Sequence, residues 1–471
     1  MLDRWLKRWS WRNLRIASGA QEWLRRRFTP AGQAVLAGTL AAGVFGIDTR
    51  MTAAHQAFAL GAALLLIAAL GRLRGARGLS AMRRLPRRAS AGEPCHYRVR
   101  LQHTGTRLLT GLALAERLPD PRPNKAAFLT TRAPIEARLN PLERLLGYPR
   151  WEWMVRQGRR VEPQPPLPLR DLAPGEAIEQ RMTLVPTRRG PLRLDALVAA
   201  RTEPLGLMRR ELPLAAGDRL LVLPRRYPVP ALRQAGRRRL QPGGVNLAAA
   251  VSDSKEFIGL RDYLPGDSPR DIHWAAWARS GEPVVKEYQD ELFSRQALIL
   301  DSFVDDGADG HTAPGEREFE CAVSVVASLV EPLSRAGARE DALLDLMFVA
   351  GRAHRVTGGR GLASTDHMLE ILASLPADHH GHFATLGELV LAQAAQLSAC
   401  ICVLLRWDPP RQDLVRRLRA LGLPVQVLLV AGPDLADPPP GTIRVEPDDP
   451  ASALARLGAA AQTPPLQPQL A

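Results

Sequence analysis

The sequence predicts a multi-domain chain with an N-terminal two-helix transmembrane hairpin, a strand-rich sandwich-like domain and a C-terminal α/β domain with a parallel sheet. Three observations predict this order. Two apolar runs lie near the start, short alternating runs broken by Gly, Pro and Thr follow, and longer segments with strand and helix periods alternate from residue 297. With 471 residues, 46% of them hydrophobic, the chain can bury the cores of two or three domains.

The predicted hairpin consists of residues 31–47 and 53–70, each just long enough for a bilayer core, which takes about 20 apolar residues. Residues 1–30 carry eight Lys and Arg against two acids, and residues 71–90 carry seven Arg and no acid. The positive-inside rule then predicts a multi-pass protein of the cell (inner) membrane with both ends and all soluble domains in the cytoplasm. The alternative is a pair of helices in a soluble core.

The net charge of +15 suggests nucleic-acid binding, but its distribution argues against this function. The two Arg-rich blocks hold almost all of it, which leaves +2 for residues 91–471. We therefore expect a lipid bilayer, and no nucleic acid, as the partner of the basic residues. The Trp residues among the basic residues of segment 1–30 suit a helix lying at the lipid headgroups, and a solvated basic arm is the alternative.

The soluble part divides by composition. We expect the strand-rich domain over residues 91–225, where residues 119–170 interrupt the strand pattern as an insertion or long loop. Residues 226–250 indicate a basic linker, with contact to anionic lipid or an acidic partner as the alternative. The α/β domain and the segment before it occupy residues 251–432, and residues 433–471 are expected to be a disordered tail.

Periodicity predicts the individual elements. Strands are expected at residues 96–101, 111–115, 177–185, 192–199, 220–223, 297–301, 342–349, 400–405 and 425–430, and helices at residues 317–334, 365–375, 385–398 and 412–421. The four Cys residues have no metal-finger spacing, which indicates a reduced, intracellular setting.

Charged, aromatic and turn residues are densest in residues 256–291. Ser268, directly before a proline, predicts a helix start, and Gly281 predicts its end about three turns later. Residues 265–267 indicate a turn, and residues 284–288 a strand.

This segment resembles the signature of a bacterial family called domain of unknown function 58, and residues 202–208 resemble a further landmark, with Glu203 where Asp is more usual. The resemblance implies a membrane-anchored protein with a von Willebrand factor A-like α/β domain, a MoxR-type AAA+ ATPase as partner and no established enzymatic activity. The signature residues, which we treat as the candidate partner-docking set, are Arg261, Tyr263, Gly266, Asp267, Arg270, Trp274, Arg279, Lys286 and Glu291.

The signature has three interpretations. It is a structural clasp if its arginines and Asp267 pair with nearby charges and hold the two soluble domains together. It is a docking surface if its Arg, Tyr and Trp residues anchor a partner. It is catalytic if His273 acts as a base, although a hydrogen-bonding role suits this histidine better because no nucleophile stands at a fixed distance from it.

The resemblance also implies a divalent cation after the first strand of the α/β domain, held by an Asp-x-Ser-x-Ser motif. Here only Asp301 matches, since Phe303 cannot ligate and Asp305 replaces the second Ser. Asp301 and Asp305 are the candidate ligands for Mg²⁺, with a solvated acidic loop as the alternative and no other cofactor expected. The predicted function is a non-enzymatic adaptor or assembly factor, and the alternative is a metal-dependent enzyme that uses this loop.

Overall fold

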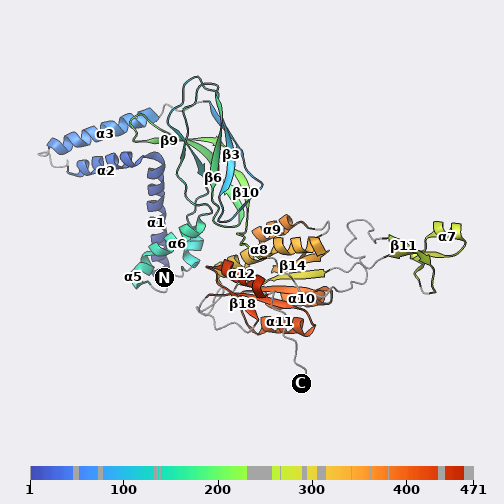
Figure 1. Cartoon of the computed structure of the whole chain (residues 1–471). Helices are drawn as coiled ribbons and strands as arrows, with labels where there is room; N and C mark the ends of the chain where they lie inside the picture. The colour runs from blue at the N-terminus through green and yellow to red at the C-terminus, as the bar shows by residue number, and fades with distance from the viewer. Residues whose placement is uncertain are drawn as a thin grey trace. The chain divides into compact units, whose positions relative to one another are not determined.

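A computed structural model divides the chain into two compact units, Met1–Leu223 and Pro224–Ala471, each described by itself (Figure 1). The structure describes residues 2–45, 52–72, 78–131, 133, 136, 139–230, 257–265, 267–288, 294–304, 315–340, 342–359, 363–379, 381–432 and 441–460.

Two apolar helices lie side by side near the start of unit 1: α2 (Pro30–Phe45) and α3 (Thr52–Arg72). A Cβ atom on Gly61 would stand 2.1 Å from Thr39 Oγ1, so the helices approach closely because this residue has no side chain. Among the described helices, α3 alone contains a span long and apolar enough to cross a membrane. The 16-residue α2 is apolar but shorter than such a span.

Three antiparallel or mixed sheets surround one core in the strand-rich part of unit 1. Their orders are β1-β3-β6, β2-β10-β7 and β5-β4-β8-β9, and each contributes to the core, for example through Val99, Leu194 and Leu114. Strand β3 alternates strictly between buried and exposed residues, as its sequence predicts. The strands are β1 (Leu79–Arg84), β2 (Arg88–Ser90), β3 (Cys95–His103), β4 (Leu112–Arg117), β5 (Leu167–Pro168), β6 (Ala177–Leu184), β7 (Gly190–Leu194), β8 (Ala196–Thr202), β9 (Arg209–Ala215) and β10 (Asp218–Leu223).

The strand-rich fold begins before residue 91, because the Arg-rich residues that separate it from α3 already form β1 and β2. Within the predicted insertion, three helices form: α4 (Lys125–Thr130), α5 (Pro141–Leu146) and α6 (Tyr148–Gly158). All three contact α1 (Leu2–Arg27). The start of the chain is therefore not a solvated arm, because one side of α1 packs on this insertion.

The turn between β8 and β9 holds the corner between α1 and α2. Thr29 donates its backbone N–H to the carbonyl oxygen of Leu207 at 3.0 Å. A Cβ atom on Gly32 would stand 1.9 Å from the same oxygen, so only glycine allows α2 to start this close to the sheet. Phe28, which is 5% exposed, pairs with Met208 in a single β-bridge.

The carboxylate of Glu203 organises that turn. It accepts backbone N–H groups from Leu205 and Leu207 at 2.6 Å each and from Met208 at 3.0 Å. Charged acceptors make such hydrogen bonds strong, and the buried Glu203 side chain is shielded from water. The family-like landmark at residues 202–208 thus fixes the surface on which the apolar helices start.

Unit 2 contains a six-stranded sheet of order β15-β14-β13-β16-β17-β18 with helices on both faces (Figure 1). Helices α8 (Glu316–Glu340), α9 (Thr365–Ser374) and α12 (Pro450–Ala460) cover one face, and α10 (Phe383–Gln393) and α11 (Pro409–Ala420) cover the other. The strands are β13 (Ser294–Leu300), β14 (Ala342–Ala350), β15 (Arg352–Gly358), β16 (Ala399–Leu404), β17 (Val425–Val430) and β18 (Thr442–Val445).

Two expectations for this unit are wrong. The sheet is mixed and not parallel throughout, because Gly351, with φ of 69°, turns the chain back so that β15 pairs antiparallel with β14. The predicted tail at residues 433–471 is not disordered over residues 441–460, because this segment forms β18 and α12. Its Val445 and Leu454 are fully buried, which an Ala-rich and Pro-rich composition did not indicate.

The predicted linker at residues 226–250 is described only at its start, where the chain contacts α8. Arg226 pairs with Glu331 at 3.1 Å, and Tyr227 donates its backbone N–H to Ser328 Oγ at 2.8 Å. Residues 231–250 lie outside the described part of the chain.

A carboxyl group with an unusual environment lies between β1, β3 and β4. Glu116 accepts the Tyr97 hydroxyl at 2.8 Å and lies 3.5 Å from the Arg83 guanidinium, and its side chain is 10% exposed. Burial raises the pKa of Glu116 from its ordinary 4.5 to about 6, because the loss of water outweighs the charge of Arg83 and the Tyr97 hydrogen bond.

We expect the stability of the strand-rich domain to fall as pH rises from about 4.5 to 6. Between these values the folded state binds more protons than the unfolded state, and a shift of this size corresponds to about 2 kcal/mol. Glu116→Gln should remove the dependence, because the neutral amide can still accept from Tyr97. Hydrogen exchange of β3 and β4, corrected for intrinsic rates, measures it; equal pH slopes in parent and variant would contradict the assignment.

Candidate functional site

The signature segment forms a small module. Strands β11 (Phe257–Asp262) and β12 (Val284–Tyr288) pair antiparallel, and both the 3-10 turn η2 (Pro269–Asp271) and helix α7 (Trp274–Ser280) contact β12. The predicted turn at residues 265–267 is confirmed by the backbone hydrogen bond from Asp267 to Leu264 at 3.0 Å, and the strand at residues 284–288 is confirmed.

The predicted helix start at Ser268 is wrong. Helix α7 begins at Trp274, and the side chain of His273 caps it by accepting the backbone N–H of Ala276 at Nδ1, 2.9 Å away. A continuous helix is prevented because Ile272 forms a β-bridge with Val285. His273 therefore has the hydrogen-bonding role that the sequence favoured, and Gly281, with φ of 77°, ends the helix as predicted.

Arg261 and Asp267 form the centre of the module. Two guanidinium nitrogens of Arg261 donate to the two carboxylate oxygens of Asp267 at 2.7 Å each, and Asp267 also accepts the backbone N–H of Leu264 at 2.9 Å. These hydrogen bonds lower the pKa of Asp267 to about 2. The pair closes the loop after β11 within the module.

The remaining signature residues lie around this pair. Trp274 is 64% exposed and its ring stacks on Trp277 with centroids 5.3 Å apart, while Arg279 is exposed at the end of α7. Tyr263, through its backbone N–H, bonds Pro283 at 3.0 Å, and Lys286 is half-buried on β12. Gly266, Glu291 and the side chain of Arg270 lie outside the described residues.

The second candidate position lies where the order of the α/β sheet reverses. Strand β13 pairs with β14 on one side and β16 on the other, and ligands of open α/β sheets bind at the carboxyl ends of such strands. Asp301 follows β13 at this point and is fully buried. Its backbone N–H donates to Val403 at 2.9 Å, which holds the two strand ends together.

Arg411 of α11 fills this position. Its Nε and one terminal nitrogen donate to the two Asp301 oxygens at 2.6 and 3.0 Å, and its guanidinium carbon lies 4.5 Å from the centre of the Phe383 ring. The backbone N–H groups of Leu405 and Phe303 donate to the same two oxygens at 3.0 and 3.2 Å. Each oxygen thus accepts one guanidinium and one backbone N–H.

Asp301 in this arrangement does not fit the role of a Mg²⁺ ligand, because a cation would lie beside a buried guanidinium that already neutralises the carboxylate. The second candidate ligand, Asp305, lies outside the described residues. Within the described residues no three His, Cys, Asp or Glu side chains are grouped so as to hold a metal ion.

A second buried pair lies at the other end of β13. Arg295 donates to Asp345 at 2.6 Å, and the two side chains are 1% and 0% exposed. Burial raises the pKa of Asp345, against the charge of Arg295. Sequence reasoning missed both pairs, because Arg295 and Arg411 lie 50 and 110 positions from the acids that they meet; an acid within an apolar run, as at Asp345, is the signal that was present.

Residues 259–455 match the model of the family described as "Protein of unknown function DUF58". No curated protein matches the chain. A crystal structure of proximal thread matrix protein 1 from the mussel byssus is similar at 11% identity and a TM-score of 0.26 over 36% of this chain. The alignment spans 46% of that structure, less than half its length, and so low a score supports no conclusion.

We expect Asp301→Ala to destabilise the α/β unit by about 3 kcal/mol, because the buried Arg411 would keep only the partly exposed Asp408 as counter-charge and two backbone N–H groups would lose their acceptor. The Asp301→Ala/Arg411→Ala double variant should lose less than the sum of the single variants. Asp413→Ala, which breaks ion pairs of exposed arginines, serves as control and should cost less than about 1 kcal/mol. Denaturant unfolding gives these values, and an Asp301→Ala variant as stable as the parent would contradict them.

Proposed function

We propose, for a chain whose C-terminal region belongs to the DUF58 family, that it is a membrane-anchored, non-enzymatic adaptor or assembly factor. Its partner, in this proposal, is a MoxR-type AAA+ ATPase, as the family resemblance implies. The α/β unit would be von Willebrand factor A-like, which the strand order around β13 and the helices on both faces support. The observation that carries the proposal is an exposed apolar helix pair near the start of the chain, together with the exposed Trp274 in the signature.

The exposure of α3 supports the anchor. A core helix of a soluble protein is mostly buried, whereas only 11% of the apolar window in Ala53–Gly71 is buried. Leu60, Leu66 and Ile67 are each more than half exposed, as are Leu40 and Val44 on the neighbouring α2. Apolar surface of this extent on two adjacent helices is typical of a membrane-contacting site.

The charge distribution supports the orientation. The last turn of α1 holds Arg25, Arg26 and Arg27 directly before α2, and residues 71–90, after the apolar run that forms α3, carry seven Arg. In this proposal α2 and α3 enter the bilayer as a hairpin, and both soluble units face the cytoplasm. The 16-residue α2 would cross the bilayer with little tilt, and the bilayer would thin locally around it because the helix is shorter than the hydrocarbon core.

The signature module supports a docking role. Trp274 and the leucines at positions 260 and 264 are exposed, although apolar side chains of this size usually become buried in interfaces. The Arg261–Asp267 pair keeps the loop beside them in one conformation, which lowers the entropy lost on binding. An exposed aromatic surface of this kind fits the docking role of an adaptor.

We expect the full chain to remain with membranes after a carbonate wash. Leu60→Arg/Leu66→Arg should move it toward the soluble fraction, because an arginine near the centre of a spanning helix costs up to about 2.5–3.5 kcal/mol of insertion free energy. Leu108→Arg/Leu421→Arg changes two exposed leucines outside α2 and α3 and should have no effect. A parent chain found in the aqueous fraction without detergent would refute the anchor.

Trp274→Ala should weaken binding of the ATPase by about 30-fold, because a central interface Trp contributes roughly 2 kcal/mol or more. Trp5→Ala, at a similar exposure of 61%, is the matched control and should bind like the parent. The measurement is recovery of a MoxR-type ATPase by the detergent-solubilised full chain under ATP-trapping conditions. Failure of the parent to recover any ATPase would refute this partner.

A further inference from the structure

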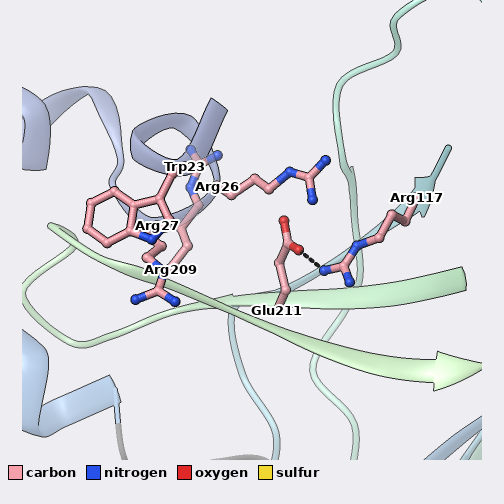
Figure 2. Close-up of a pocket in the computed structure, with 6 residues that line it drawn as sticks. All are labelled: Trp23, Arg26, Arg27, Arg117, Arg209 and Glu211. Carbon is pink, nitrogen blue, oxygen red and sulfur yellow. Dashed lines mark hydrogen bonds and ion pairs between the residues drawn. The ribbon is translucent and has the colours of Figure 1, made fainter. Parts of the chain in front are cut away.

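One pocket in unit 1 has an excess of positive charge, and the proposed adaptor function assigns no ligand to it. Its volume is about 280 Å³, close to the lower end of the roughly 300–1,000 Å³ range of small-molecule sites. We call it the basic pocket, and it is lined by Trp23, Arg26, Arg27, Arg117, Arg209 and Glu211 (Figure 2). Four guanidinium groups and one carboxylate give its lining a net charge of +3.

Two of the four arginines form ion pairs with glutamates of the same chain. Arg117, at the end of β4, pairs with Glu211 of β9, as the dashed line in Figure 2 shows. Arg26 pairs with Glu22 one helical turn earlier, with 2.6 Å between the atoms. Because these ion pairs are partly exposed, each contributes little to the stability of the fold. Each pair still holds its arginine side chain at the pocket.

The other two arginines carry the excess charge. Arg27 lies over the Trp23 ring, with 4.7 Å between the guanidinium carbon and the ring centre, and within the described part of the chain Arg209 has no acidic partner. Two half-buried guanidinium groups in one hollow repel each other unless an anion lies between them. The planar guanidinium groups suit the oxygens of a phosphate, which accept hydrogen bonds in pairs.

The position of the basic pocket favours a lipid as the source of that phosphate. Trp23, Arg26 and Arg27 belong to the last turns of α1, and the apolar α2 starts at Pro30. If α2 enters a bilayer, residues so close before it lie at the depth of the headgroups, where Trp and Arg residues are enriched. Basic residues at this depth are attracted to a bilayer surface that contains anionic lipids.

We propose that the basic pocket binds the phosphate of an anionic phospholipid headgroup. The pocket itself follows from the described side chains, and only the choice of lipid over free phosphate rests on the proposed membrane anchor. Glu211 competes with the phosphate for the guanidinium groups, because its carboxylate pairs with Arg117 and lines the same pocket.

The test uses the full chain in a non-ionic detergent, with bound lipid measured by native mass spectrometry during titration with phosphatidylglycerol or phosphatidylcholine. Phosphatidylglycerol should bind in preference, and Arg27→Gln/Arg209→Gln should weaken its binding about 10- to 100-fold because two charge-assisted contacts are lost. Arg117 stays unchanged, since its removal would leave Glu211 unpaired. Arg98→Gln/Arg100→Gln, at exposed positions of β3 outside the pocket, is the charge-matched control and should leave binding unchanged.

Glu211→Gln separates binding from folding, because it should raise phosphatidylglycerol affinity about fivefold by removing a nearby negative charge. Equal losses in Arg98→Gln/Arg100→Gln and in the pocket variant, or no preference over phosphatidylcholine, would overturn the proposal. Complete displacement by millimolar inorganic phosphate would keep an anion site but overturn the lipid assignment. The detergent titration does not depend on membrane insertion, so a failed carbonate wash and a failed pocket are distinguishable.

Discussion

The buried carboxylate of Glu203 determines how unit 1 is put together. It binds three backbone N–H groups of the turn between β8 and β9, and so fixes the Leu207 carbonyl that receives Thr29. Gly32 can start α2 against that carbonyl only because it lacks a side chain. The direction of the apolar helices and the placement of the last turn of α1 beside β9, hence the basic pocket, all follow from this turn.

In unit 2, buried charged side chains also determine how distant elements are joined. Strand β13 has an Arg–Asp pair at each end, Arg295–Asp345 at its start and Asp301–Arg411 at its end. Each pair joins elements that are distant in the sequence, and a slip by one residue would leave a charge buried without its partner. Open α/β sheets usually bind a ligand at the position that Asp301 occupies. Here the Arg411 side chain fills it, so the position joins β13 to α11 and leaves no room for a ligand at Asp301.

The sequence predicted the elements that local patterns specify. Alternation of buried and exposed residues gave β3, and a β-branched run gave β12 with its observed bounds. The sequence-based prediction failed where residues distant in the sequence determine the secondary structure. The segment Arg352–Gly358 is poor in apolar residues and becomes a strand only because β14 offers it an edge, and α7 starts at Trp274 because Ile272 is bound to Val285. The site residue Arg411 was invisible, since nothing near it in sequence indicates that Asp301 needs a counter-charge.

The buried carboxylates and thiols among the described residues are poorly placed for catalysis. A catalytic group needs an unsatisfied proton donor or acceptor with access to substrate. Asp301 and Asp345 are each engaged by two or more donors, and the four cysteines are buried and unbridged. Burial raises the pKa of Cys321 and Cys400 to about 12, which keeps these thiols protonated and unreactive. Among the described residues, the exposed groups include apolar side chains on α2 and α3 and the indole of Trp274, and these suit the lipid and protein contacts that we propose.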